Sequence, residues 1–269
     1  MDYIGKYEEQ VYPKERVIAS DIFDLGMKRH YVSGLAEVDV TEARRILSEQ
    51  AASGEEKLSF TGWVTKCIAQ AVSEHKIVHA MRHGKKHLIV FDDIDVSVLL
   101  ETNFKDGTIP KPLIVRRAQD KTVSQITNEI RAAQRQKLSD SWEQLGEGSG
   151  ERIARLARIF PSLPKVFRRI VYRKWKDPFF VKKNLGTVLV SSVGMFARMG
   201  GWGLPIGTHP LVFILGGIGR KPGVVEDRIE IRDMLSVTMM FNHDVVDGAP
   251  VVRFGQRLAD LVQSAFGLR

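Results

Sequence analysis

The chain has 269 residues, 43% of them hydrophobic, and its 40 Lys or Arg against 32 Asp or Glu give a net charge of +8. This length allows a substantial core, in one large domain or two small ones. The sequence lacks the run of about 18 apolar residues that a transmembrane helix needs, and it lacks a signal-peptide pattern. Its single cysteine excludes an internal disulfide framework. We therefore expect a cytoplasmic location.

The first half of the chain predicts a mixture of helices and strands. Apolar residues at helical spacing predict helices, and runs rich in β-branched residues predict strands. In chain order we expect an arm or short helix over 1–30, a strand over 31–40, a helix from Thr41 to about Ser53, a helix over 58–75 capped by Ser59 or Thr61, strands over 87–91 and 94–100 joined by a turn at Asp92-Asp93, an extended segment over 109–115 and a helix over 123–136.

Four histidines recur every four residues in this part of the chain, namely His75, His79, His83 and His87. On one continuous helix they would share a face and resemble a metal site. The Gly84-Lys85-Lys86 turn interrupts such a helix, and the set lacks a supporting carboxylate or thiol. We therefore expect no metal site.

The segment from about 138 to 183 differs from the rest of the chain. It contains a glycine-rich linker at 146–150, and its residues 151–183 hold eleven Lys or Arg against two Asp or Glu. Because the excess positive charge is confined to this segment, we expect no nucleic-acid partner. Apolar residues recur at helical spacing among the cations, and Pro161 and Pro164 divide the pattern into two short helices. These apolar residues are Ile153, Leu156, Ala157, Phe160, Leu163, Phe167, Ile170 and Val171.

Three interpretations of this basic amphipathic segment remain open. It could be an insertion that packs its apolar face on the body and exposes its charge to water. It could instead bind an acidic protein partner, or lie on an anionic membrane surface.

The last third of the chain predicts mainly strands. We expect strands over 187–193 and 211–218, a hairpin across 224–231, a strand over 234–241 and a helix from Pro250. Because strands and helices mix without strict βαβ alternation, the pattern favours an α+β sandwich.

The turn after the strand Met234–Phe241 carries the clearest candidate for chemistry. His243 lies where the strand ends, and Asp247 follows four residues later at the mouth of a helix. A histidine held at a strand end beside a carboxylate is a plausible general base. Alternatively, Asp247 only caps the helix and Gly248 only permits a tight turn.

This turn, Phe-Asn-His-Asp-Val-Val-Asp-Gly over 241–248, resembles the His-x-x-x-Asp-Gly signature of the 2-oxoacid dehydrogenase acyltransferases and of chloramphenicol acetyltransferase. Three further segments resemble stretches of that family: Pro112–Val123, Gly186–Phe196 and Pro210–Arg220. The likeness covers roughly residues 30–136 and 184–266.

Some features of that family have no counterpart here. The sequence shows neither a lipoyl domain, with its lipoyl attachment site, nor a peripheral-subunit-binding domain, and the basic segment matches nothing in the family. At the signature, Asn242 and Asp244 stand where the dehydrogenase branch usually has Asp and Arg. This difference leaves the substrate open.

The resemblance implies a fold and an assembly. We expect an α+β chloramphenicol acetyltransferase-like two-layer sandwich with a mixed sheet and flanking helices, in which residues 1–269 form a single catalytic domain with the basic segment as an insertion. It also implies a homotrimer with active sites between subunits, and coenzyme A as a substrate, although the residues that bind coenzyme A are not identified.

The resemblance further implies a mechanism. A coenzyme-A-dependent acyltransferase would move an acyl group between coenzyme A and a thiol of the dihydrolipoyl type, or another acceptor. His243 would be the general base, Asp247 would hold the geometry of the site, and Ser191 would donate a hydrogen bond to the oxyanion of the tetrahedral intermediate. Its neighbour Ser192 is a close alternative. The family pattern also implies a basic partner for Asp247 near Lys28 or Arg29.

Two rival functions follow from the same resemblance. The chain could acetylate a small hydroxyl compound, as chloramphenicol acetyltransferase does, or it could serve as an assembly scaffold without turnover. The intact set of His243, Asp247 and Ser191 favours an enzyme. Some of the charge of the basic segment could also steer the phosphates of coenzyme A towards the site.

Overall fold

The structure is a computed structural model that describes residues 4–54, 56–100, 111–135, 160–194 and 200–269. Within these ranges, no helix combines the length and the apolar character needed to span a membrane. In chain order the elements are α1 (Lys14–Gly26), β1 (Tyr31–Asp39), α2 (Thr41–Ala52), α3 (Phe60–Glu74), η1 (Lys76–His79), β2 (Met81–His83), β3 (His87–Ile89), β4 (Val96–Leu100), β5 (Lys111–Val115), η2 (Ala118–Asp120), α4 (Val123–Arg135), η4 (Phe160–Ser162), α6 (Lys165–Tyr172), η5 (Arg173–Lys176), α7 (Pro178–Leu185), β6 (Val188–Ser192), β7 (Leu211–Val225), β8 (Arg228–Asn242) and α8 (Gly248–Gln263).

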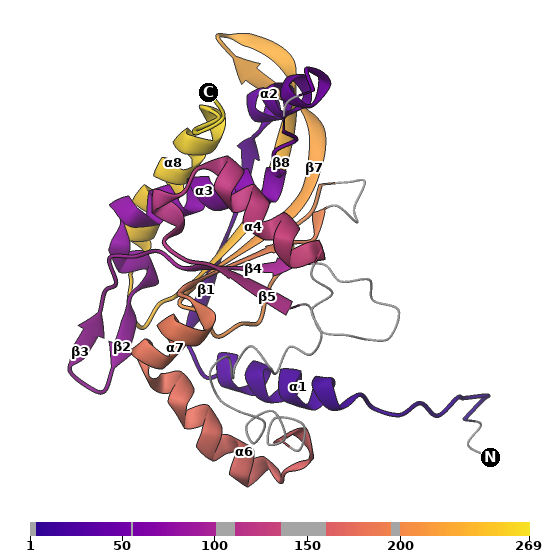
Figure 1. The fold of residues 1–269 in the computed structure, drawn as a ribbon, viewed down its shortest axis with the longest axis vertical. Coiled ribbons are helices and arrows are strands. Elements are labelled where there is room, and N and C mark those ends of the chain that lie inside the picture. Colours follow the sequence, from indigo (N-terminus) through magenta and orange to yellow (C-terminus); the bar gives the residue numbers. More distant parts are fainter. Residues whose placement is uncertain (1–3, 55, 101–110, 136–159, 195–199) are drawn as a thin grey trace.

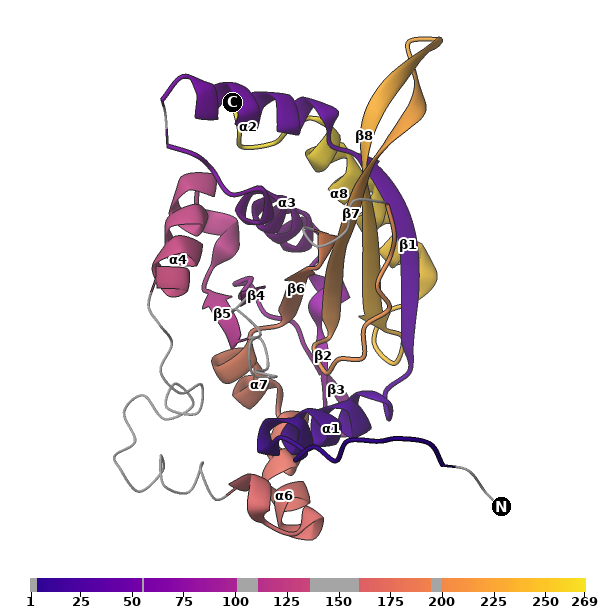
Figure 2. The ribbon, with the colours of Figure 1, turned by 90° about the vertical axis from the view of Figure 1, so that its right-hand side faces the viewer.

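A mixed six-stranded sheet forms the centre of the fold, in the order β1-β8-β7-β6-β4-β5. The pairs β4–β6 and β6–β7 are parallel, and the other pairs are antiparallel. Helices α3, α4 and α8 pack on one face of the sheet, while α1, α6 and α7 gather at one end of the molecule (Figures 1 and 2). This arrangement confirms the predicted α+β sandwich with a mixed sheet and flanking helices.

The main hydrophobic core lies between the sheet and these helices. Trp63 of α3, Phe254 of α8 and Phe213 of β7 are fully buried in it. Strand β6 contributes Val188 and Val190, which are also fully buried, because parallel neighbours flank the strand on both sides. The apolar stripes and runs that predicted these elements therefore coincide with the faces that form the core.

The opposite face of the sheet carries a smaller apolar cluster of Val212, Ile214 and Met240. Part of it is covered by the segment 200–209. Gly207 packs against Val212, and the indole Nε1 of Trp202 donates to the carbonyl oxygen of Ala36 at 3.1 Å. Among the described residues, helices cover one face of the sheet, and irregular chain covers part of the other.

Strands β7 and β8 form one long hairpin, which differs from the sequence prediction. We expected a separate hairpin across 224–231, but the two strands are continuous over fifteen residues each and turn at Glu226-Asp227. Both turn residues have positive φ angles, 47° and 61°, as in the tight turns that suit twisted hairpins. The hairpin extends beyond the helices at the end of the molecule opposite to α6 (Figure 1).

The strands predicted near 87–91 and 94–100 both form, with a bend at Asp92-Asp93 between them, but they belong to different sheets. Strand β3 pairs with β2 in a separate small hairpin, and β4 belongs to the main sheet. This hairpin brings His83 opposite His87, whereas His75 ends α3 and His79 lies in η1. The described residues contain no cluster of three or more His, Cys, Asp or Glu side chains that could hold a metal ion.

The basic segment also differs from its prediction. The linker at 146–150 and the first of the two expected helices lie outside the described residues, and α7 was not expected. On α6 the first of the three interpretations, in which the apolar face packs on the body, is wrong, because Arg168 and Tyr172 are buried whereas Phe167 and Ile170 are 59% and 56% exposed. Hydrophobic spacing identified the apolar side of this helix but not the side that packs on the body.

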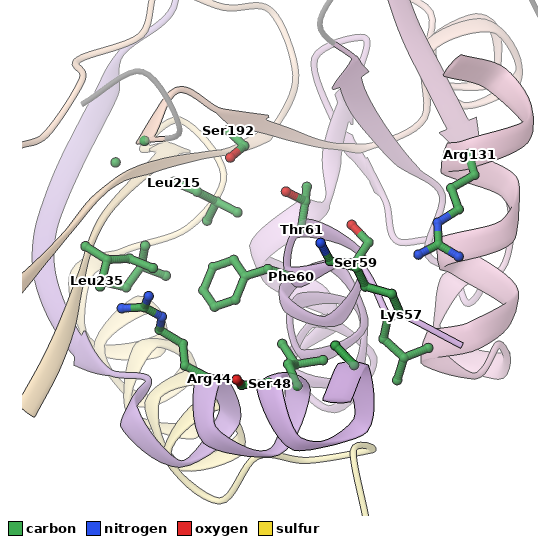
Figure 3. Close-up of a pocket in the computed structure, with 16 residues that line it drawn as sticks. Arg44, Ser48, Lys57, Ser59, Phe60, Thr61, Arg131, Ser192, Leu215 and Leu235 are labelled. Atoms are coloured by element: carbon green, nitrogen blue, oxygen red, sulfur yellow. The ribbon is translucent and has the colours of Figure 1, made fainter. Parts of the chain in front are cut away.

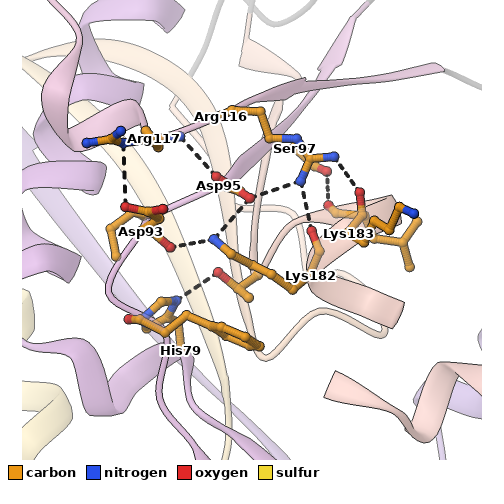
Figure 4. Close-up of polar contacts among 12 residues, drawn as sticks. His79, Asp93, Asp95, Ser97, Arg116, Arg117, Lys182 and Lys183 are labelled. Carbon is orange, nitrogen blue, oxygen red and sulfur yellow. Dashed lines mark hydrogen bonds and ion pairs between the residues drawn. The ribbon is translucent and has the colours of Figure 1, made fainter. Parts of the chain in front are cut away.

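Asp95 joins the basic segment to the sheet (Figure 4). Its buried carboxylate accepts from Arg116 Nη1 at 2.9 Å, Lys182 Nζ at 3.0 Å and the backbone N–H of Arg117 at 2.9 Å. Burial alone would raise the pKa of Asp95, but these donors outweigh it and hold the pKa below 3.8. Gly186, with φ of 72°, ends α7 so close to Asp95 that a Cβ would lie 2.6 Å from the Asp95 carbonyl oxygen.

His79 is a second buried contact at the start of β6. Its Nδ1 lies 2.7 Å from the hydroxyl of Thr187, and its Nε2 lies 3.1 Å from the carbonyl oxygen of Phe91. A neutral ring satisfies both contacts, with Nε2–H donating to Phe91 and the Thr187 hydroxyl donating to Nδ1. Burial lowers the pKa of His79 to about 4.

We predict that His79 makes the stability of the fold sensitive to mild acid. An unfolded histidine with a pKa of 6.5 binds a proton below that pH, whereas folded His79 stays neutral until about pH 4. The stability that His79 contributes above pH 6.5 is therefore lost as the pH falls, by about 2 kcal/mol between pH 7 and pH 5. Urea unfolding at the two pH values should show a smaller loss for His79→Gln than for the wild type.

The matched control is His87→Gln, which replaces an exposed histidine outside the core by the same residue, glutamine. His209, whose pKa burial also lowers to about 4, contributes equally to all three proteins. An equal loss of stability for His79→Gln and the wild type would contradict the assignment.

Candidate active site

His243 lies in a turn that backbone contacts fix at both ends. Its backbone N–H donates to the carbonyl oxygen of His30 at 2.8 Å, which ties the turn to the start of β1. The preceding residue, Asn242, donates its N–H to Pro210 and accepts from the N–H of Asp244 through its side chain at 3.1 Å. The imidazole of His243 is 44% exposed, so a substrate can reach it.

Asp247 lies beside His243 as expected, although the two do not form a hydrogen bond. The distance from His243 Nδ1 to Asp247 Oδ1 is 3.9 Å, and the Asp247 side chain is 89% exposed. Asp247 is the residue before α8, yet its side chain accepts no capping hydrogen bond. The contact with the histidine is therefore the better supported of the two interpretations of Asp247.

A second His–Asp pair, which the sequence analysis missed, lies next to the first. His30 Nδ1 is 2.7 Å from Asp244 Oδ1, and this hydrogen bond lowers the pKa of Asp244. Asp244 is one of the two residues that depart from the family signature. That departure was a signal that the polar contacts around the turn differ, but the sequence did not indicate His30 as the partner.

The implied partnership between Asp247 and a basic residue near position 29 is not what the structure shows. Arg29 donates instead to the carbonyl oxygen of Thr208, to the hydroxyl of Tyr31 at 3.2 Å and to the carbonyl oxygen of Trp175 at 3.4 Å. Its guanidinium therefore joins the start of β1 to the basic segment.

Ser191 is far from His243 within one chain. It pairs with Ile214 of β7, which in turn pairs with Thr238 of β8, and His243 lies five residues beyond Thr238. Five residues of strand span about 16 Å, and the two strand-to-strand steps add about 4.8 Å each sideways. The two residues therefore lie at opposite ends of the sheet, and one chain alone does not bring them together.

A cavity of about 780 Å³ lies at the Ser192 end of the sheet (Figure 3). Three cations line it: Arg44 from α2, Lys57 just before α3 and Arg131 from α4. The N-terminus of α3, capped by Ser59, opens into the same cavity, and Phe60 and Leu235 form part of its apolar wall. Alternation along β6 directs Ser192 into this cavity and Ser191 to the other face of the sheet.

A smaller cavity of about 360 Å³ lies at the His243 end. Asn242 and Asp244, which flank His243, line it together with Arg29, Arg82 and Lys176. Lys176 belongs to the basic segment, so that segment adjoins the turn that carries His243. Neither cavity was predicted, because the cations that line each one come from three separate stretches of the chain.

Comparison with known proteins identifies the family. The family model for the 2-oxoacid dehydrogenases acyltransferase (catalytic domain) matches residues 13–145 and 183–268. A dihydrolipoyllysine-residue acetyltransferase component of the pyruvate dehydrogenase complex from Mycoplasma pneumoniae is 25% identical over 215 residues, covering 79% of this chain and 43% of the relative. A lipoamide acyltransferase component of a branched-chain alpha-keto acid dehydrogenase complex from Pseudomonas aeruginosa is 24% identical, covering 97% of this chain and 53% of the relative. The chain spans about half the length of these curated relatives.

Solved structures share the fold. A probable dihydrolipoamide acetyltransferase from Listeria monocytogenes superimposes with a TM-score of 0.66 at 18% identity, covering 98% of this chain and 97% of that one. The cubic core of a pyruvate dehydrogenase multienzyme complex gives 0.69 at 16% identity, covering 98% and 95%. Chloramphenicol acetyltransferase gives 0.50 at 14% identity, covering 94% and 99%. With its family model matched over most of its length, the chain belongs to the 2-oxoacid dehydrogenase acyltransferase family and corresponds to the catalytic domain of that family.

Proposed function

We propose that this chain is a coenzyme-A-dependent acyltransferase in which His243 is the general base. A thiol with a pKa near 8.5 is mostly protonated at neutral pH and needs a base when it attacks. The imidazole would take the proton as the thiol sulfur bonds to the acyl carbonyl carbon. When the tetrahedral intermediate collapses, the bond to the departing sulfur breaks, and the imidazolium of His243 gives its proton to that thiolate. Asp247, close to the ring and exposed, would hold its orientation.

We propose that Ser191 stabilises the negative oxygen of that intermediate, and that it does so across a subunit boundary. Ser191 and His243 lie at opposite ends of one sheet, so a site that uses both needs two copies of the chain. Within the part of the chain that the structure describes, irregular chain covers only part of the sheet face that carries Ser191, which leaves room for a neighbouring copy. The likeness to the cubic core of a dehydrogenase complex supports such an assembly, with the homotrimer as its unit.

The larger cavity is our candidate for the nucleotide end of coenzyme A. Arg44, Lys57 and Arg131 supply positive charge for phosphates, and the N-terminus of α3 adds free backbone N–H groups. Arg44 pairs with Asp233 and Arg131 pairs with Glu56, whereas Lys57 has no ion-pair partner among the described residues. A neighbouring copy would bring its His243 turn to this end of the sheet.

The single observation that carries the proposal is the place of His243, exposed on a fixed turn with Asp247 within 4 Å. We expect the described elements to form one catalytic domain with the basic segment as an insertion. A hydroxyl acceptor, as in chloramphenicol acetyltransferase, and a scaffold without turnover are the alternative outcomes of the first experiment below.

We predict that His243→Gln lowers the turnover number at least about a hundredfold, because the attacking thiol loses its base. Acyl transfer from a panel of acyl-CoAs to dihydrolipoamide, with the products separated by chromatography, measures the effect. His87→Gln, a change of an exposed histidine on β3, is the control and should keep full activity. Transfer only to hydroxyl compounds would favour the alternative enzyme, and no wild-type turnover with any acceptor would favour the scaffold.

We predict that two inactive variants restore each other's activity when they are co-expressed. In an assembly with sites between subunits, a His243→Ala copy and a Ser191→Ala copy together form some sites with both residues intact, about a quarter of the total. Activity of the mixture should therefore rise well above that of either variant alone. Sites formed within single chains would give no recovery. Ser192→Ala in place of Ser191→Ala tests which serine takes part.

We predict that Lys57→Ala raises the KM for coenzyme A roughly tenfold with little change in kcat, because one charge-assisted contact to a phosphate is lost. Pantetheine, which lacks the nucleotide, should be used equally well by the variant and the wild type. Lys85→Ala, in the turn of the small hairpin, is the control. An equal loss with pantetheine and coenzyme A would place Lys57 outside the nucleotide site.

A further inference from the structure

The basic segment has no role in the proposed chemistry, and the family model leaves out its residues 146–182. The match stops at residue 145 and resumes at residue 183. Within the described part of this segment, α6 and η5 present a surface that we call the insertion surface. It consists of the exposed apolar residues Val166, Phe167, Ile170 and Val171 with the exposed cations Arg169 and Arg173.

The orientation of α6 is opposite to the one that hydrophobic burial alone would select. Arg168 faces inward, where it pairs with Asp21 of α1 at 2.5 Å, and both side chains are less than a tenth exposed. Tyr172, on the same buried side, packs edge-on against Phe160 and Trp175. Exposing each large apolar side chain costs about 1.5–3 kcal/mol relative to burying it. A helix fixed in this way presents an apolar face that a partner would cover.

The charge around this face indicates the kind of partner. Residues 160–185 contain eight Lys or Arg and one acidic residue, Asp177. Arg169, Arg173 and Lys174 have no ion-pair partner among the described residues. A second copy of this chain would bring like charges together at this surface, which costs several kcal/mol. The complementary partner is acidic with an apolar patch.

The end of η5, which follows the insertion surface along the chain, lies close to the turn that carries His243. The carbonyl oxygen of Trp175, at the end of η5, accepts from Arg29 at 3.4 Å. The next residue, Lys176, lines the 360 Å³ cavity together with Asn242 and Asp244. The candidate coenzyme A cavity lies at the other end of the sheet. In both views α6 is at the outer edge of the molecule beside α1 (Figures 1 and 2).

From this juxtaposition we infer that the insertion surface docks a small acidic carrier protein, which presents the acceptor thiol to His243 on a flexible arm through the smaller cavity. The inference rests on the proposed function and names the partner in it. An anionic bilayer would also attract an apolar helix rimmed by cations. A carrier explains in addition why this surface lies beside the catalytic turn, because docking there raises the local concentration of a tethered thiol.

The test compares thiols on carriers with free thiols. The full chain would transfer acyl groups from acyl-CoA to two purified acidic carriers, a phosphopantetheinylated acyl carrier protein and a reduced lipoyl domain, and to free pantetheine and dihydrolipoamide. We expect kcat/KM to be higher for at least one carrier than for its free thiol, and to fall as the ionic strength rises. The carrier with the higher kcat/KM shows whether the thiol arm is phosphopantetheine or dihydrolipoyl.

Two variants of the insertion surface make the test specific. R169E/R173E reverses its charge, and F167S/I170S removes its apolar anchors. Each should lower kcat/KM with the carrier roughly tenfold, through a higher KM, and leave the free thiol within about twofold. R220E/R228E reverses two exposed cations on the β7–β8 hairpin at the far end of the molecule and should change neither value.

Three outcomes would overturn the inference. Carrier-bound thiols could react no faster than free ones, the surface variants could lose activity equally with both, or the chain could sediment with phosphatidylglycerol vesicles through Phe167 and Ile170 while carriers have no advantage. In each case free thiols still accept the acyl group, so the proposed function stands. Failure of all thiols as acceptors would instead overturn the proposed function itself.

Discussion

The start of β6 is the constraint on which the rest of the structure depends. The carbonyl oxygen of Asp95 accepts from the backbone N–H groups of Thr187 and Val188, which sets β6 in parallel register with β4. The carboxylate of the same residue holds Lys182 of α7, and His79 holds the Thr187 side chain. A few buried polar contacts therefore fix the strand that positions Ser191 and Ser192, and also the point at which the basic segment returns to the body.

The register of the sheet then determines what one chain can and cannot do. Because β6 is parallel to β7 and β7 is antiparallel to β8, the end of β6 and the end of β8 point in opposite directions. A cavity lined by three cations lies at one end, and an exposed histidine lies at the other. Under the proposed function, a site between two copies would combine one end of each, so coenzyme A and the acceptor would approach from opposite sides.

Sequence patterns predicted the helices, strands and turns that depend on interactions between neighbouring residues. The apolar stripe of α3, the apolar runs of β6 and β7 and the strand, turn and helix around His243 all formed as expected, because burial and turn chemistry act over neighbouring residues. Contacts between residues far apart in the sequence could not be predicted from such patterns. The pair of Arg168 with Asp21 fixes the orientation of α6, and the pair of His30 with Asp244 contacts the turn that carries His243, yet each joins residues more than 140 positions apart. The cations of both cavities were missed for the same reason.

The basic segment is attached to the body at a fixed point, which Asp95 provides. Its described end returns to the body through Lys182, one residue before the family model resumes, and Asp95 holds that return whatever the intervening sequence is. The entropy of closing a connection grows only slowly with its length, so changes of length in this stretch cost little. Under the proposed docking of a carrier, recognition would rest on this stretch and the chemistry on the part of the chain that the family model matches, so exchanging residues 146–181 would change the partner rather than the reaction.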